Sequence, residues 1–143
     1  AASTWYLCGD NFWPEVLGAY DRPPVLGGRE GAVAFGVGRS GSGVPLHRHG
    51  AAFLEVAFGR KRWFVAPPGS AVNFDPTRST LLWYHSHLQA GSLPANVLLC
   101  SQGPGEVLYL PDGWWHATLN VGETVFFLDF LAPRAGPSSG GFR

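Results

Sequence analysis

The chain has 143 residues, of which 45% are hydrophobic, and this is enough apolar surface for the core of one domain. Ten basic residues balance ten acidic ones, and a formal net charge of zero argues against a nucleic-acid groove or an anionic-membrane surface, because both need a basic excess. No run of residues approaches the roughly eighteen apolar positions of a membrane-spanning helix.

Twenty glycines and twelve prolines divide the chain into short β-rich runs. In chain order these are Ala32–Val37, Phe53–Phe58, Arg62–Ala66, Val97–Cys100, Glu106–Leu110, Trp115–Leu119 and Thr124–Leu131. Such runs, separated by turn residues, predict an all-β sandwich or barrel. One or two short peripheral helices are expected, at Phe12–Tyr20 and within Asn73–Ala95. Residues 134–143 are rich in Gly, Ser and Pro and predict a flexible tail, which leaves residues 1–133 as the domain.

His47 and His49 are two residues apart, in the segment Val44–Gly50. On a strand, this spacing places both imidazoles on one face with their Cα atoms about 6.6 Å apart, which allows them to chelate one ion. A pair of surface histidines without a role is the alternative for any isolated pair of this kind. Glu55 has the same parity and is a candidate for an additional ligand, although Gly50 can interrupt the strand.

A third histidine follows a tight turn. The sequence Pro111-Asp112-Gly113 predicts a turn between two strands, and this turn directs His116 back toward the mouth of the barrel. We therefore predict a metal site formed by His47, His49 and His116. Asp112 is a second alternative source of a carboxylate.

Two other patterns are not expected to bind a ligand. Gly36–Gly41 fits the spacing G-x-G-x-x-G of dinucleotide-binding proteins, but an extended segment follows it in place of a helix, so we predict a flexible turn. His85 and His87 repeat the spacing of His47 and His49 within a polar connection. No third ligand on a turn lies near them in the sequence.

The residues around the three histidines resemble the two motifs of the cupin superfamily. Gly105, Pro111, Gly113, His116 and Asn120 match G-x5-P-x-G-x2-H-x3-N, and Gly41, His47 and His49 match G-x5-H-x-H, with Glu55 and Gly59 displaced from their usual spacing. The runs Gly59–Trp63 and Pro111–His116 are more specifically similar to the jumonji-C (JmjC) family. The resemblance covers about Trp5 to Pro133. It implies a double-stranded β-helix, or jelly-roll barrel, that holds Fe(II) and 2-oxoglutarate and hydroxylates or demethylates a protein.

The ligand set departs from the pattern of the family. Its members hold iron with two histidines and one carboxylate, which leaves three positions for a bidentate keto acid and O₂. His47 and His116 match the two histidines, but His49 occupies the position of the carboxylate. Three histidines can still bind Fe(II), or Zn(II) in its place. The missing negative charge predicts weak or no oxygenase activity.

Lys61, the one lysine of the chain, stands where the family places the lysine that holds the distal carboxylate of 2-oxoglutarate. Strand alternation predicts that Lys61 faces inward while Arg60 and Arg62 face outward. An ordinary solvated lysine is the alternative.

Other expected cosubstrate contacts also come from the resemblance. Tyr6 is similar to the tyrosine that assists the same carboxylate, and Asn120 of the second motif is a further candidate for cosubstrate binding. Val44 replaces the usual threonine or serine, which removes one hydrogen bond to the keto acid.

These features leave three hypotheses. The first is an Fe(II)/2-oxoglutarate oxygenase-like domain that acts on a protein or peptide side chain. The second is a non-catalytic JmjC module that binds a protein or peptide partner. The third is a metal-binding cupin of another chemistry, such as a three-histidine thiol dioxygenase or an isomerase, and Lys61 and the run Trp114–His116 make it the least favoured.

The sequence gives less direct information on the cellular compartment and on the redox state of the cysteines. The run Tyr6–Asn11 resembles a small lumenal branch of the family, which implies the lumen of the endoplasmic reticulum. The residues Ala1–Asp10 lack the pattern of a signal peptide, and the chain has no methionine, so we expect a mature form or an excised domain. Cys8 and Cys100 fit either one disulfide or two free thiols.

Overall fold

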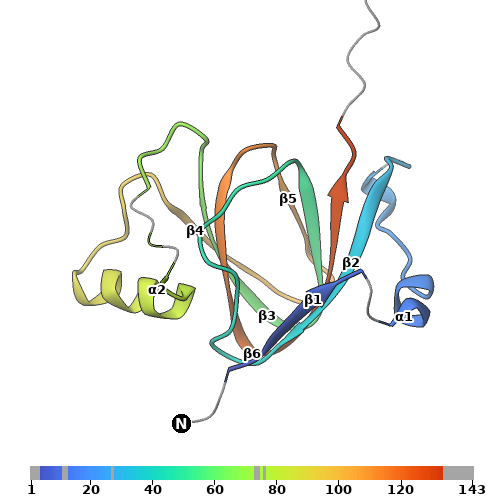
Figure 1. Ribbon diagram of the computed structural model, residues 1–143, viewed down its shortest axis with the longest axis horizontal. Helices are drawn as coiled ribbons and strands as arrows, with labels where there is room; N and C mark the ends of the chain where they lie inside the picture. The colour runs from blue at the N-terminus through green and yellow to red at the C-terminus, as the bar shows by residue number, and fades with distance from the viewer. Residues whose placement is uncertain (1–3, 11–12, 27, 73–74, 76, 134–143) are drawn as a thin grey trace, which may run out of the picture.

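The computed structural model describes residues 4–10, 13–26, 28–72, 75 and 77–133. Its strands are β1 (Tyr6–Gly9), β2 (Gly31–Gly38), β3 (Ala52–Ala66), β4 (Leu98–Gln102), β5 (Val107–Leu110) and β6 (Trp115–Leu131). Its helices are α1 (Pro14–Gly18), α2 (Thr80–Gln89) and the short 3₁₀ helix η1 (Pro24–Leu26). The antiparallel strands follow the order β1-β2-β6-β3-β4, with β5 also paired to β3. The fold is therefore the expected all-β jelly-roll barrel, with short peripheral helices (Figure 1).

The two long strands, β3 and β6, pair with each other along their length and pass through both layers of the barrel. Each contains one glycine with positive φ, Gly59 at 81° and Gly122 at 80°, a conformation that residues with a Cβ atom rarely adopt. The strands predicted at 53–58 and 62–66 are therefore two arms of one strand. The runs at 115–119 and 124–131 are likewise two arms of β6.

The register between β3 and β6 shifts twice, between Val56 and Phe58 and between Phe58 and Arg60. Val56 on the first arm and Trp63 on the second both belong to one interior cluster with Phe126. Even-numbered residues of β3 thus face inward before the shifts, and odd-numbered residues face inward after them, because bulges change which side chains face the interior.

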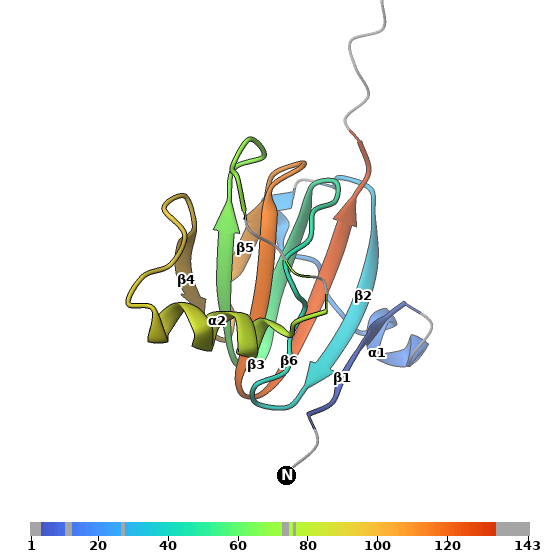
Figure 2. The same ribbon diagram turned by 60° about the vertical axis from the view of Figure 1, so that its left-hand side comes forward.

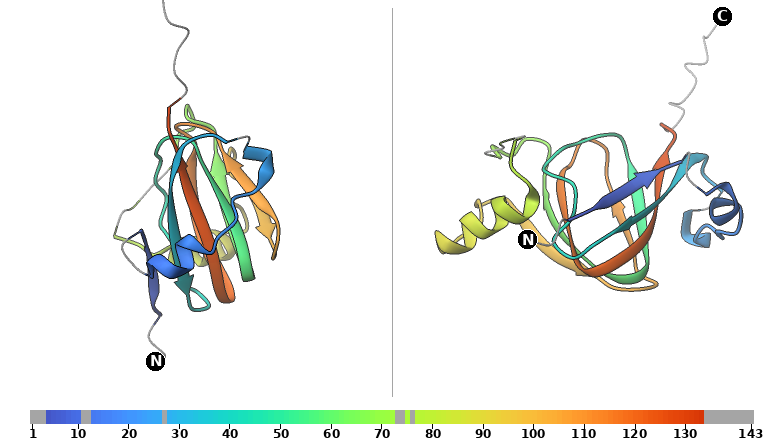
Figure 3. Two further views of the ribbon diagram at one scale, coloured as in Figure 1. Left: turned by 90° about the vertical axis from the view of Figure 1, so that its right-hand side faces the viewer. Right: turned by 60° about the horizontal axis from the view of Figure 1, so that its bottom comes forward.

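Different segments cover the outer faces of the two layers. On one side, Tyr20 stacks on Phe127 of β6 with ring centroids 3.9 Å apart. On the other side, Trp83 of α2 packs edge-on against Phe64 of β3 at 5.2 Å. Figures 2 and 3 show α1 and α2 on opposite sides of the barrel. The interior is thus enclosed by the two layers and closed off from both outer faces.

Within the described part of the chain, no helix has the length and apolar character needed to cross a membrane.

The C-terminal limit of the domain was also predicted. Residues 134–143, the predicted tail, lie outside the described residues. The division into a domain at 1–133 and a tail therefore stays a prediction.

Candidate metal centre and cavity

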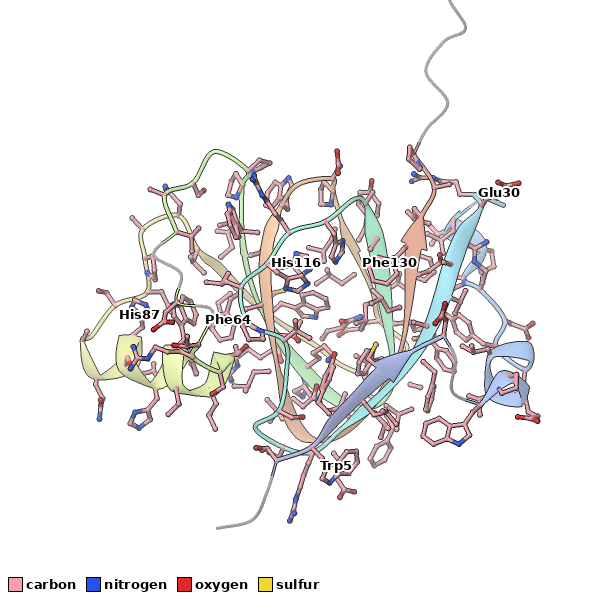
Figure 4. The ribbon with its side chains drawn as sticks, viewed as in Figure 1. Trp5, Glu30, Phe64, His87, His116 and Phe130 are labelled. Carbon is pink, nitrogen blue, oxygen red and sulfur yellow. The ribbon has the colours of Figure 1, made fainter. Side chains whose placement is uncertain are left out.

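His47, His49 and His116 meet inside the barrel, where Figure 4 labels His116. One ring nitrogen of each lies within 4.8 Å of the others. The Nε2 atoms of His49 and His116 are 3.0 Å apart. Two nitrogens bound at about 2.1 Å and at right angles to one ion lie about 3.0 Å from each other, so this pair has the spacing of neighbouring metal ligands.

Backbone hydrogen bonds bring the distant histidines together. His47, which lies outside the named strands, and His116 of β6 exchange both backbone N–H···O bonds, at 3.0 and 2.9 Å, in an isolated bridge. The turn before β6 is tied to the same segment, because Gly113, with φ of 73°, donates its N–H to the carbonyl of His49 at 3.0 Å. The predicted Pro-Asp-Gly turn thus delivers His116 to the other two histidines.

Each histidine has its Nδ1 atom beside a backbone carbonyl. The carbonyls belong to Pro45, Gly50 and Trp114, at 2.7, 2.7 and 3.0 Å from His47, His49 and His116. A carbonyl can only accept, so Nδ1 carries the hydrogen of each neutral imidazole and Nε2 keeps its lone pair. The Nε2 lone pairs of His49 and His116 then face each other at 3.0 Å, an arrangement that a cation between them would stabilise.

Protonation of the histidines does not readily provide this positive charge. Burial lowers the pKa of His116 to about 4, and the neighbouring His47 lowers the pKa further. Burial likewise lowers the pKa of His47. Both rings therefore remain neutral near pH 7. Neutral imidazole nitrogens suit Fe(II) or Zn(II), so the three residues fit a divalent metal ion.

The histidines line a cavity of about 220 Å³. Tyr6, Cys8 and Thr118 add polar groups to its wall, and the rest is largely apolar. Val44 also lines it, and the backbone N–H of Val44 donates to the Thr118 hydroxyl at 3.2 Å. The structure thus places a hydroxyl beside the position where the family's usual one is missing. Thr118 could have been found from the sequence, because it alternates with His116 and Asn120 along one strand.

Lys61 is fully buried and faces inward. Its ammonium donates to Oδ1 of Asn120 at 2.9 Å and lies 3.8 Å from the ring centre of Phe126 and 5.3 Å from that of Tyr6. Among the described residues no carboxylate forms an ion pair with it. Burial lowers the pKa of Lys61 to about 7. Arg62, as predicted, points outward and donates to Tyr84 of α2 at 3.1 Å.

The glycines of the G-x-G pattern make room for this arrangement. A Cβ atom on Gly36 would lie 2.1 Å from the ring of Phe126, and one on Gly38 would lie 2.4 Å from the amide nitrogen of Asn120. The predicted flexible turn is therefore wrong for these two residues, which belong to β2. Close packing around Lys61, and not a phosphate, explains the missing side chains.

Glu55 lies away from the histidines, which corrects its expected position. Its carboxylate accepts a hydrogen bond from Tyr20 at 2.7 Å on the outer face of the barrel. The cause is the break between the two segments: His47 lies in an isolated bridge and β3 begins only at Ala52, so strand alternation does not carry from His47 and His49 to Glu55. Asp112 is also absent from the histidine group in the described part of the chain.

His85 and His87 lie on α2, outside the barrel, as Figure 4 shows for His87. The ring of His87 packs against Trp83 at 4.7 Å. The two cysteines are free thiols: Cys8 lines the cavity, whereas Cys100 is exposed on β4. Strand β1, which carries Tyr6 and Cys8, was not among the runs that the sequence predicts as strands.

Comparisons with known proteins agree with this architecture. No family model matches the sequence. The mouse JmjC domain-containing protein 8 is 46% identical over 132 residues, which cover 90% of this chain and 49% of that protein. The chain thus spans about half the length of the curated relatives it matches.

Solved structures of two proteins share the fold. The ribosomal oxygenase YcfD of Escherichia coli has a TM-score of 0.61 and 23% identity, over 92% of this chain and 33% of that one. A cupin superfamily protein of Desulfitobacterium hafniense has a TM-score of 0.51 and 13% identity, over 93% of this chain and 83% of that one. Another structure of YcfD, with a TM-score of 0.51 and 20% identity over 75% of this chain and 25% of that one, contains cobalt and succinic acid.

Proposed function

Because this chain belongs to the JmjC family of the cupin superfamily, we propose that it binds one divalent metal ion through His47, His49 and His116. Fe(II) is the proposed ion, with Zn(II) able to replace it. The observation that carries the proposal is the pair of facing Nε2 atoms at 3.0 Å, both left without hydrogens by the Nδ1 contacts. Bound Fe(II) would supply the ability to activate oxygen.

We further propose that the cavity accepts 2-oxoglutarate, with Lys61 as the residue for its distal carboxylate. A fully buried ammonium without a carboxylate partner among the described residues supports this, because a buried charge is costly until an opposite charge reaches it. Tyr6 and Asn120 both contact the ammonium and would hold it in place. The succinic acid bound by YcfD is a diacid of the same class.

Weak or absent oxygenase turnover is part of the proposal. A carboxylate ligand offsets one charge of the metal, and the neutral imidazole of His49 does not. Val44 offers no hydrogen bond to a keto acid, and a lost bond to a charged group costs about 1.5–3 kcal/mol, or tenfold or more in affinity. The chain then acts as a binding-competent domain. A protein or peptide is the proposed partner.

The metal proposal is tested by measuring the metal content of the purified chain after loading with Fe(II) or Zn(II). We expect one equivalent in the wild type and none in His116→Ala, because the remaining two imidazoles share one short segment. His85→Ala is the matched control and should keep the full equivalent. Equal metal in the wild type and in His47→Ala/His49→Ala would contradict the proposed ligands.

The turnover proposal is tested by succinate formation from 2-oxoglutarate with iron, ascorbate and oxygen. We expect little succinate from the wild type and more from His49→Asp/Val44→Thr, which restores the carboxylate and the hydroxyl of the family pattern. Robust turnover by the wild type would contradict the argument from the missing carboxylate. Metal binding without turnover in either protein would favour the non-catalytic interaction module.

A further inference from the structure

The two cysteines stand in opposite electrostatic surroundings. Cys8 lies on β1 and lines the cavity; burial raises the pKa of its thiol, and the charge of Lys61 lowers that pKa. Cys100 is exposed on β4; partial burial raises the pKa of its thiol, and the charge of Glu106 raises it further. An anion that approaches Cys8 is therefore attracted, whereas an anion that approaches Cys100 is repelled.

The hydrogen bonding and burial of Lys61 favour an anionic ligand beside Cys8. An ammonium has three hydrogens to donate, and in the described structure one hydrogen-bond acceptor, Oδ1 of Asn120, meets them. The rings of Phe126 and Tyr6 cover the rest of the charge. Tyr6 lines the cavity beside Cys8, and its ring centre lies 5.3 Å from the ammonium, which is itself behind the cavity wall. A carboxylate that passed Tyr6 from the cavity would supply the acceptors that this fully buried group lacks.

We propose that Cys8 is a covalent modification site for small anionic electrophiles, of which α,β-unsaturated dicarboxylates are the class that fits. One carboxylate pairs with Lys61 while the Cys8 sulfur attacks the carbon–carbon double bond. The S–C bond forms as the π bond breaks, and the thiol proton passes to the adjacent carbon. No oxidant or reductant is needed.

The modification would control the proposed cosubstrate site, and in this consequence it rests on the proposed function. The adduct keeps two carboxylates within the cavity of about 220 Å³ that the histidines also line. With Lys61 neutralised by a tethered carboxylate, a free diacid loses its cation. Modified protein should therefore lose affinity for diacids while it keeps the three histidines for a metal.

The test uses the purified, metal-free chain, so its outcome does not depend on metal binding or turnover. The chain is treated in parallel with iodoacetate and with neutral iodoacetamide, and both cysteines are followed by peptide mass spectrometry. We expect the ratio of the iodoacetate rate to the iodoacetamide rate to be at least tenfold higher at Cys8 than at Cys100. Fumarate should give an adduct at Cys8 first.

Two comparisons make the result decisive. Lys61→Met should lower the ratio at Cys8 to that of Cys100, while Arg62→Met, which removes a cation from the outer face, should leave it unchanged. Succinate, a diacid that cannot react, should protect Cys8 of the wild-type protein and not Cys100, and this arm needs no variant. Equal ratios at both cysteines, or no protection by succinate, would overturn the proposal.

Discussion

Replacing Lys61 with methionine is expected to remove a pH dependence of stability, because this substitution deletes a buried charge and keeps the length of the side chain. Burial lowers the pKa of Lys61 from 10.5 to about 7 on folding. Between these values the unfolded chain binds a proton that the folded chain does not. Stability therefore rises with pH across this window, and below about pH 7 the full cost of burying the charge is present.

The size of the effect follows from the two pKa values. Their separation corresponds to about 5 kcal/mol of unfolding free energy across the whole window, at about 1.4 kcal/mol per pKa unit. Between about pH 7 and about pH 8.5 the contribution of Lys61 changes by about 1.5 kcal/mol, because the folded group is already half neutral at the lower pH. This is large enough to measure.

The assay is urea unfolding followed by tryptophan fluorescence at the two pH values, with Cys8→Ala in every protein, because the Cys8 thiol is the other ionisable group that acts on Lys61. The protein that retains Lys61 should gain about 1.5 kcal/mol more than Lys61→Met over this interval. Arg62→Met should behave like the protein that retains both residues. Equal gains in unfolding free energy with and without Lys61 would refute the reasoning. Saturating succinate should reduce the gain of the protein that retains Lys61, because a bound carboxylate favours the charged lysine.

Two further predictions concern packing and a buried ion pair. Gly36→Ala should destabilise the fold by about 1–3 kcal/mol in urea unfolding, because its Cβ would overlap the Phe126 ring. Gly18→Ala, with no atom within 4 Å of the added Cβ, should not destabilise it. Equal effects of the two substitutions would contradict the packing around Gly36. Arg22→Met should cost about 3–5 kcal/mol, because it leaves the fully buried carboxylate of Asp129 without its guanidinium, which binds at 2.5–2.6 Å. A change no larger than that of Arg29→Met, which removes a guanidinium with one exposed hydrogen bond to a backbone carbonyl, would refute this.

The grouping of the three histidines could be predicted because local rules determine it. Two of them are two residues apart, and the third follows a Pro-Asp-Gly turn whose glycine donates to the carbonyl of His49. The inward direction of Lys61 could be predicted for a similar reason, since alternation holds along the second arm of β3. Both inferences depend on the local geometry of a few residues of backbone.

Glu55 shows where such reasoning stops. Its parity with His47 and His49 is correct in the sequence, but the chain is not a continuous strand between His49 and Ala52. The face that β3 turns inward is instead set by its pairing with β6, about 60 residues later in the chain. Strand β1 was missed for the same reason, since its four residues are fixed by pairing with β2. Gly36 looked like part of a loop because its neighbour Phe126 is distant in sequence.

The long ladder between β3 and β6 also has a consequence for how fast the protein reaches its native state. Lys61 and Asn120, which meet across this ladder, are 59 residues apart in the chain. The chain must close a loop of that length before the central pairing gives any stabilisation, and proteins dominated by such distant pairings fold in milliseconds to seconds. The histidine group depends on another distant pairing of β6, the isolated bridge between His47 and His116. Metal held by the complete group should therefore slow unfolding more than it accelerates folding, because a site that joins such distant segments is completed late on the folding pathway.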